Sequence, residues 1–158
     1  MTELALARVI HVLGVVLWIG GVAMVTTVIL PAVKRIASAD DQVSLFETIE
    51  HRFAWQARAT TLLTGLSGFY LVHAMQAWSR FSVASYWWMH TMVLVWVLFT
   101  LVLFVLEPLV LRRLFLRHAA NNPRRTFALI QRMHWVLLLL SLLTVAGAVA
   151  GSHGWLWL

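Results

Sequence analysis

The chain contains no cysteine, and only six of its 158 residues are Asp or Glu. The absence of cysteine excludes disulfides, iron–sulfur clusters, c-type haem attachment and thiolate copper sites. Charged residues make up 11% of the chain, less than half of the roughly 25% found in soluble domains. No Ser/His/Asp arrangement, glycine-rich phosphate loop or pair of carboxylates at a common depth is present. An ordinary enzyme is therefore not the first expectation.

Hydrophobic residues, in contrast, make up 61% of the chain. Apolar runs of roughly 20 residues, long enough to cross a bilayer at about 1.5 Å per residue, occur four times. They cover about residues 4–33, 55–78, 84–111 and 127–150. Each run must be helical, because lipid offers no partners to unpaired backbone groups. The sequence therefore predicts an all-α fold: one domain over residues 1–158 that forms an integral membrane, up-and-down four-helix bundle.

The connection between the first and second runs is the longest and carries a pattern of its own. Ser38 and Asp40 predict a helix start, because short oxygen-bearing side chains bind free backbone N–H groups there and acids suit the helix dipole. An apolar face then recurs at helical spacing opposite a charged face (Val43, Phe46, Ile49 and Phe53 against Asp41, Glu47, Glu50 and Arg52). We expect a short amphipathic helix at the membrane interface that runs into the second span.

The positive charges predict the orientation. The formal net charge of +6 does not indicate a nucleic-acid partner, because the charges lie in connections between apolar runs. Lys and Arg concentrate in two connections (Lys34, Arg35, Arg52 and Arg58 in the first; Arg112, Arg113, Arg117, Arg124 and Arg125 in the third). An aromatic belt falls at the other side (Trp78, Tyr86, Trp87, Trp88, Trp155 and Trp157). The positive-inside rule then predicts a multi-pass protein of the bacterial cytoplasmic (inner) membrane with both termini outside.

Three of the seven histidines lie at nearly one depth near the predicted outer face. By helix rise, His73 lies about 7 Å inside the aromatic belt, His90 about 5 Å inside it, and His11 about 10 Å from the start of the first apolar run at residue 4. A histidine in hydrocarbon is costly and usually serves a function. Three at one depth predict a site for a metal or a haem.

The first span carries a further pattern. His11, Gly14, Trp18 and Gly21 share one helix face, and a glycine one turn from a histidine leaves room for a flat macrocycle. The alternative is that the glycines only allow close contact between helices, as small residues do in membranes.

Methionines beside two of these histidines add a copper alternative. Met75 follows His73 closely, and Met89 and Met92 flank His90; thioether and imidazole ligands together suit Cu(I). Methionine is also a common gap filler in cores, so packing is the other explanation.

The segment from His11 to Gly21 (HVLGVVLWIGG), followed by Pro31-Ala32 and by Thr64-Gly65 in the second span, resembles the CopD-like and HemJ-like membrane families. The resemblance implies a small membrane protein associated with haem b or with copper, and it implies that His11 is a ligand. Where these families often have a lysine near the outer end of the third helix, this chain has His90, which suits bis-histidine ligation.

Three functions follow as expectations. The first is a b-type cytochrome-like protein that binds haem b near the outer face through His11 and His90, with His73 as the substitute ligand. It would pass electrons from quinol to an extracytoplasmic partner, and it could act as a haem-dependent oxidoreductase. The second expectation is copper handling, and the third is a noncatalytic membrane anchor subunit; each of the three allows an oligomer.

A second group of polar residues lies at the inner depth. Arg58, Glu107 and His134 are expected to form a hydrogen-bonded network there. The alternative is a second haem held by His134 and His51.

Overall fold

The computed structural model describes residues 2–36 and 38–155, with the backbone alone at 39, 112 and 119–121. This part of the chain is helical and contains no strand. α1 (Thr2–Met24), a π-helical segment η1 (Val25–Ile29) and α2 (Leu30–Val33) follow one another without a break. Pro31 lies just after η1. Because proline lacks an N–H and crowds the preceding turn, a widened turn at this point accommodates it.

α3 (Ala39–Ala74) is one helix of 36 residues, and it contains both the predicted interfacial helix and most of the predicted second span. It begins as expected: the Asp41 N–H donates to Ser38 Oγ at 3.3 Å. It ends four residues before Trp78, because Gln76 adopts a left-handed backbone conformation with φ of 51°. The interfacial segment is therefore the first part of a long helix and not a separate element.

Two short 3₁₀ helices, η2 (Ala77–Ser82) and η3 (Ala84–Tyr86), connect α3 to the second half of the chain. There α4 (Trp87–Leu101), the π-helical η4 (Val102–Leu111) and α5 (Arg112–Asn121) are continuous, and Pro108 lies inside η4. α6 (Pro123–Ser152) follows after Asn122, whose side chain accepts a hydrogen bond from the Arg125 N–H at 3.1 Å.

Three helices are long and apolar enough to cross a membrane: Thr2–Val33, Ala84–Leu111 and Pro123–Ser152. They match the first, third and fourth predicted spans and indicate a membrane protein. α3 is not among them, because small polar residues lower the mean hydropathy of its second half. These residues are buried and face neighbouring helices (Thr60, Thr61, Thr64 and Ser67).

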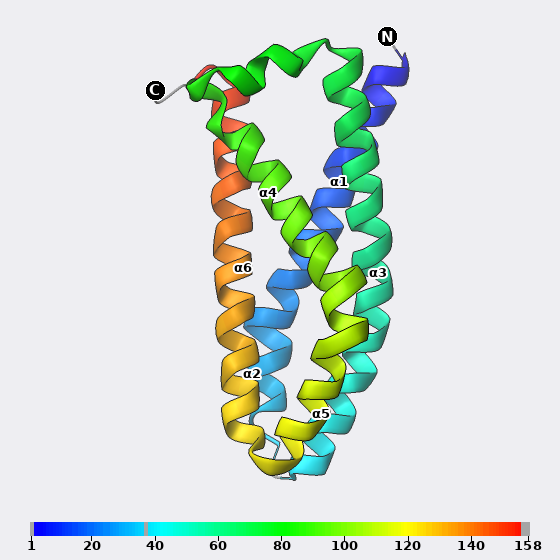
Figure 1. Cartoon of the computed structure of the whole chain (residues 1–158), viewed down its shortest axis with the longest axis vertical. Coiled ribbons are helices and arrows are strands. Elements are labelled where there is room, and N and C mark those ends of the chain that lie inside the picture. Colours follow the sequence, from blue (N-terminus) through cyan, green and yellow to red (C-terminus); the bar gives the residue numbers. More distant parts are fainter. Residues whose placement is uncertain (1, 37, 156–158) are drawn as a thin grey trace.

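The helices pack as two pairs, α1 against α3 and α4 against α6 (Figure 1). Near the middle the pairs meet in a core of Trp18, Ile19 and Val22 with Val95, Phe99 and Leu138. Toward the end that holds both termini, the N-terminal part of α4 lies beside the C-terminal part of α6 and away from α1 (Figure 1). Two glycines fix that contact, since Trp87 and Trp88 occupy the space that a Cβ at Gly147 and Gly151 would need.

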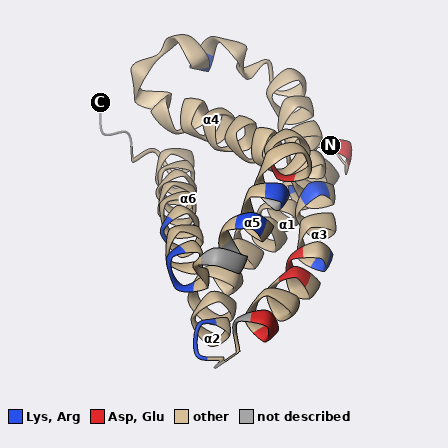
Figure 2. Ribbon diagram, turned by 60° about the horizontal axis from the view of Figure 1, so that its bottom comes forward, with Lys and Arg blue, Asp and Glu red and all other residues tan. Residues whose placement is uncertain are grey.

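Charged residues gather at the other end, where α2, α5, the start of α3 and the start of α6 lie (Figure 2). This is the end for which the positive charges of the sequence predict a cytoplasmic location. Trp157, one member of the predicted aromatic belt, lies outside the described residues.

Candidate functional site

His11 binds α3 and not a neighbouring histidine. Its side chain is half-buried, and the Nδ1–H lies 2.9 Å from the Thr64 carbonyl oxygen and 3.3 Å from Ser67 Oγ. The ring also fills the space beside Gly68, where a Cβ would be 2.9 Å from His11 Cε1. In this structure His11 therefore connects α1 to α3 through a hydrogen bond and a packing contact.

Gly14 and Trp18, the other predicted cofactor residues of the first span, are both buried. A Cβ at Gly14 would be 2.5 Å from Thr64 Oγ1, so α3 already occupies the space that a macrocycle would need. Trp18 packs edge-on against Phe99 with ring centroids 4.8 Å apart. The structure thus favours the helix-contact explanation for Gly14.

His73 and His90 are both exposed. His90 is near the start of α4, the end that packs against α6, and its ring contacts Phe81 at 5.4 Å between centroids. Among the described residues no group of three or more His, Cys, Asp or Glu side chains is placed to hold a metal ion. The structure does not bring His11, His73 and His90 together.

The methionines of the copper alternative are also dispersed. Met89 is buried and Met92 half-buried on α4, whereas Met75 is exposed at the end of α3. The Met75 sulfur accepts a contact from Arg8 Nη2 at 3.7 Å. These positions do not place the three sulfur atoms around a single metal ion.

A cavity of about 760 Å³ lies between the two helix pairs, in the half of the molecule that carries the basic end. It extends from Trp18 and Phe99, near the middle, to Asn122 and Thr126 at the basic end. Aromatic and aliphatic side chains form most of its wall (Trp18, Val22, Phe46, Phe53, Phe99, Leu103, Leu111, Phe115, Ile130 and Leu137). Its volume lies within the range of roughly 300–1,000 Å³ of ligand sites.

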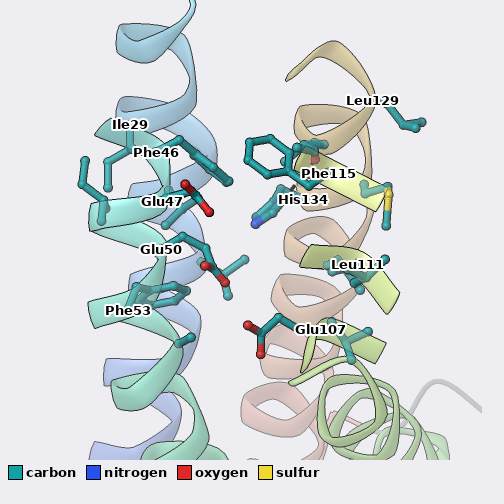
Figure 3. A pocket seen from close by; sticks show the side chains of 18 of the residues that line it. Ile29, Phe46, Glu47, Glu50, Phe53, Glu107, Leu111, Phe115, Leu129 and His134 are labelled. Carbon is teal, nitrogen blue, oxygen red and sulfur yellow. Dashed lines mark hydrogen bonds between the residues drawn. The ribbon is translucent and has the colours of Figure 1, made fainter. Parts of the chain in front are cut away.

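His134 on α6 faces this cavity (Figure 3). Its Nδ1 lies 2.9 Å from the Ile130 carbonyl oxygen of the same helix, so Nδ1 carries the proton and donates it. The Nε2 lone pair is left free on the cavity side. An imidazole fixed through Nδ1 to a carbonyl is the arrangement that orients a histidine as a metal ligand.

Glu107 on η4 also lines the cavity, and it forms an ion pair with Arg58 of α3. Arg58 Nε donates to the Leu103 carbonyl oxygen at 3.0 Å as well. The predicted Arg58–Glu107 pair is therefore confirmed. His134 is not part of it, because its hydrogen bond goes to its own helix.

Glu47 and Glu50 were expected on the charged face of an interfacial helix, opposite its apolar face, yet both line the cavity from α3, opposite His134 (Figure 3). The expectation was wrong because α3 continues without a break, so its first turns lie against α5 and α6 and not on a lipid surface. Their spacing of three residues, which places two carboxylates on one helix face, was the signal in the sequence.

One buried donor in this cavity has no partner. Trp18 is only 3% exposed and lines the end of the cavity that lies near the middle of the molecule. Its Nε1–H makes no hydrogen bond in the described structure. A buried N–H without a partner costs about 1–3 kcal/mol. A ligand with an oxygen acceptor would remove that cost.

Haem is the group that the sequence implied, and the two ends of the molecule differ in how they fit it. At the end of the molecule that holds both termini, α3 occupies the space beside His11 and Gly14, and His90 lies on the other helix pair. These residues do not fit a haem in this arrangement. The cavity offers one oriented imidazole, flat aromatic walls and a polar end with Asn122, Thr126 and Arg125, and the carboxylates of Glu47, Glu50 and Glu107 also line it.

Comparison with known proteins adds no relative: no family model, no curated protein and no solved structure matches this chain.

Proposed function

We propose that the protein is a haem b-binding redox protein of the membrane, with the haem in the cavity between the two helix pairs and His134 as its axial ligand. The observation that carries the proposal is the His134 imidazole, which is fixed by the Ile130 carbonyl and presents Nε2 to a cavity of about 760 Å³. When bound, haem b supplies one-electron redox chemistry.

The rest of the cavity suits an amphiphilic, flat ligand. Phe46, Phe53 and Phe99 form apolar walls that exclude water, and the polar groups lie mainly at the basic end. A haem has an apolar ring and an anionic edge, so its anionic edge would lie toward Arg125 and Asn122. The Trp18 N–H lies at the opposite end of the cavity, near the middle of the molecule.

The proposal includes the arrangement in the membrane. All four long helices cross, α3 with its small polar residues buried against neighbours, and the basic end lies in the cytoplasm. The haem then lies in the cytoplasmic half of the membrane, and not near the outer face as expected from His11, His73 and His90.

The test is the haem content and the reduced-minus-oxidised absorption spectrum of the purified protein, followed by separate alanine variants. His134→Ala should lower bound haem at least tenfold. His51→Ala is the matched control, because His51 is exposed on α3 and does not line the cavity.

The same series separates the alternatives. Full haem in His134→Ala with loss in His11→Ala or His90→Ala would move the site to the terminal end. Wild-type protein that purifies with copper and without haem would reject the proposal in favour of copper handling.

A further inference from the structure

A second, smaller hollow lies on an exposed side of α6. It has a volume of about 290 Å³ and is lined by Arg125, Ala128, Leu129 and Arg132. Residues 125, 128, 129 and 132 share one helix face, and the small Ala128 leaves a notch between two arginines that are two turns apart. Leu129, at the rim, is 59% exposed, as expected of a side chain that faces lipid.

The depth of this notch follows from the length of α6. The helix has 30 residues, so it is about 45 Å long and exceeds the roughly 30 Å hydrocarbon core by about ten residues. Arg132 precedes Ser152 by twenty residues, or about 30 Å. With Ser152 at the outer boundary of the hydrocarbon core, Arg132 lies at the opposite boundary, and Arg125 lies about 10 Å farther out, among the headgroups.

Both guanidinium groups lack a protein partner. Among the residues that the structure describes, neither Arg125 nor Arg132 forms an ion pair or donates a side-chain hydrogen bond; only the backbone N–H of Arg125 donates, to Asn122. An arginine at the edge of hydrocarbon extends its guanidinium group toward the headgroups, where phosphate oxygens accept its hydrogen bonds. A phosphate between the two arginines would accept hydrogen bonds from both and offset one of their two charges, and the apolar rim would hold acyl chains.

We propose that the notch formed by Arg125, Ala128, Leu129 and Arg132 binds the phosphate headgroup of an anionic phospholipid in the leaflet at the basic end of the molecule. Basic hollows at the cytoplasmic side of membrane helices have the chemistry for such headgroups. Arg125 and Leu129 also line the large cavity, whereas Ala128 and Arg132 line the notch alone, so substitutions at these two positions test the notch without changing the haem proposal.

The experiment measures lipid binding to the purified protein by native mass spectrometry, with phosphatidylglycerol and phosphatidylcholine of identical acyl chains. Phosphatidylglycerol should bind more tightly, and Arg132→Gln should weaken it by about fivefold, the effect of one arginine at an anionic surface. Arg113→Gln, which removes an exposed arginine outside the notch, should change it less than twofold.

Shape is tested separately from charge. Ala128→Leu fills the notch without changing the charge and should weaken phosphatidylglycerol binding as much as Arg132→Gln does. Ala146→Leu, at an exposed site farther along α6, is its control. If Arg132→Gln is not recovered as folded protein, Arg132→Met replaces it, because Arg132 does not line the large cavity.

Three outcomes would overturn the proposal. Equal loss in Arg113→Gln would mean that only the diffuse positive charge attracts lipid. Full binding in Ala128→Leu would mean that the notch is not the site. Displacement of the phospholipid by millimolar inorganic phosphate would make it a site for free phosphate. Haem content should stay at the wild-type level in all these variants, so failure here is distinct from failure of the haem proposal.

Discussion

Arg58 of α3 and Glu107 of η4 form an ion pair that joins the two helix pairs beside the large cavity. Arg58 also donates to the Leu103 carbonyl oxygen, in the π-helical segment that contains Pro108. A proline leaves a carbonyl of the preceding turn without its helical N–H partner, so an arginine from a neighbouring helix is a suitable donor there. The pair thus connects α3 to the most irregular part of the other helix pair.

Glu107→Gln should destabilise the protein by about 2 kcal/mol, because Arg58 loses its counter-charge. The effect is smaller than the roughly 3–5 kcal/mol of a fully buried pair, since the two side chains are 20% and 18% exposed. Thermal unfolding measures it. Replacing both partners, as Arg58→Met with Glu107→Leu, should recover most of the loss. Glu107 lines the cavity but is paired with Arg58, and Gln has nearly the volume of Glu, so Glu107→Gln should leave the haem spectrum unchanged. A lost spectrum with unchanged stability would mean that the Glu107 carboxylate contacts the haem directly.

Gly14→Ala should destabilise the α1–α3 contact by about 1–3 kcal/mol, because its Cβ would be 2.5 Å from Thr64 Oγ1. The second substitution Thr64→Ala removes that oxygen, which has no hydrogen-bond partner, and should restore stability. Gly20→Ala is the control: no atom lies within 4 Å of its Cβ position, and the change should be neutral or slightly stabilising. Unfolding of the single and double variants in detergent provides the comparison. Equal effects at Gly14 and Gly20 would contradict the contact.

Ala54→Phe should lower haem binding at least tenfold without touching a ligand. Ala54 is buried on α3 and lines the cavity, so a phenyl ring there occupies the space that the haem needs. Ala59→Phe, at an exposed position of the same helix that does not line the cavity, should retain haem. Absorbance at the haem band per mole of protein is the measurement. Retention in both variants would place the haem elsewhere.

The proposed orientation can be tested directly, because the chain has no cysteine of its own. Cysteines at Ser44 and at Ser82, both exposed and near opposite ends of the long helices, serve as reporters. An impermeant thiol reagent applied to intact cells should label Ser82→Cys only. After the membrane is permeabilised, Ser44→Cys should react as well. Labelling of Ser44→Cys in intact cells would reverse the orientation.

The helices themselves were largely predictable from the sequence. Three apolar runs correspond to the helices Thr2–Val33, Ala84–Leu111 and Pro123–Ser152, because twenty consecutive apolar residues have few alternatives. The cap at Ser38 was predictable too, since it depends only on neighbouring residues. The Arg58–Glu107 pair followed from equal depth, which helix rise supplies without knowledge of packing.

The candidate site depended on packing. Helix rise places His11 and His90 at one depth, but it does not say which helices are neighbours. The close fit of Trp87 and Trp88 against Gly147 and Gly151 holds the start of α4 on α6, while Thr64 and Gly68 hold His11 on α3. The two histidines therefore lie on different helix pairs.

The amino-acid sequence by itself determined the three apolar helices, the positions of residues along them and the end at which positive charge gathers, because these depend on runs, spacing and rise along one chain. Only the tertiary structure decided that Glu47, Glu50 and His134 face a common cavity. The physical reason is that depth is one coordinate of a side chain. The other two, its direction from the helix axis and the neighbour that it meets, are set by side-chain packing between helices, which involves residues far apart in the chain.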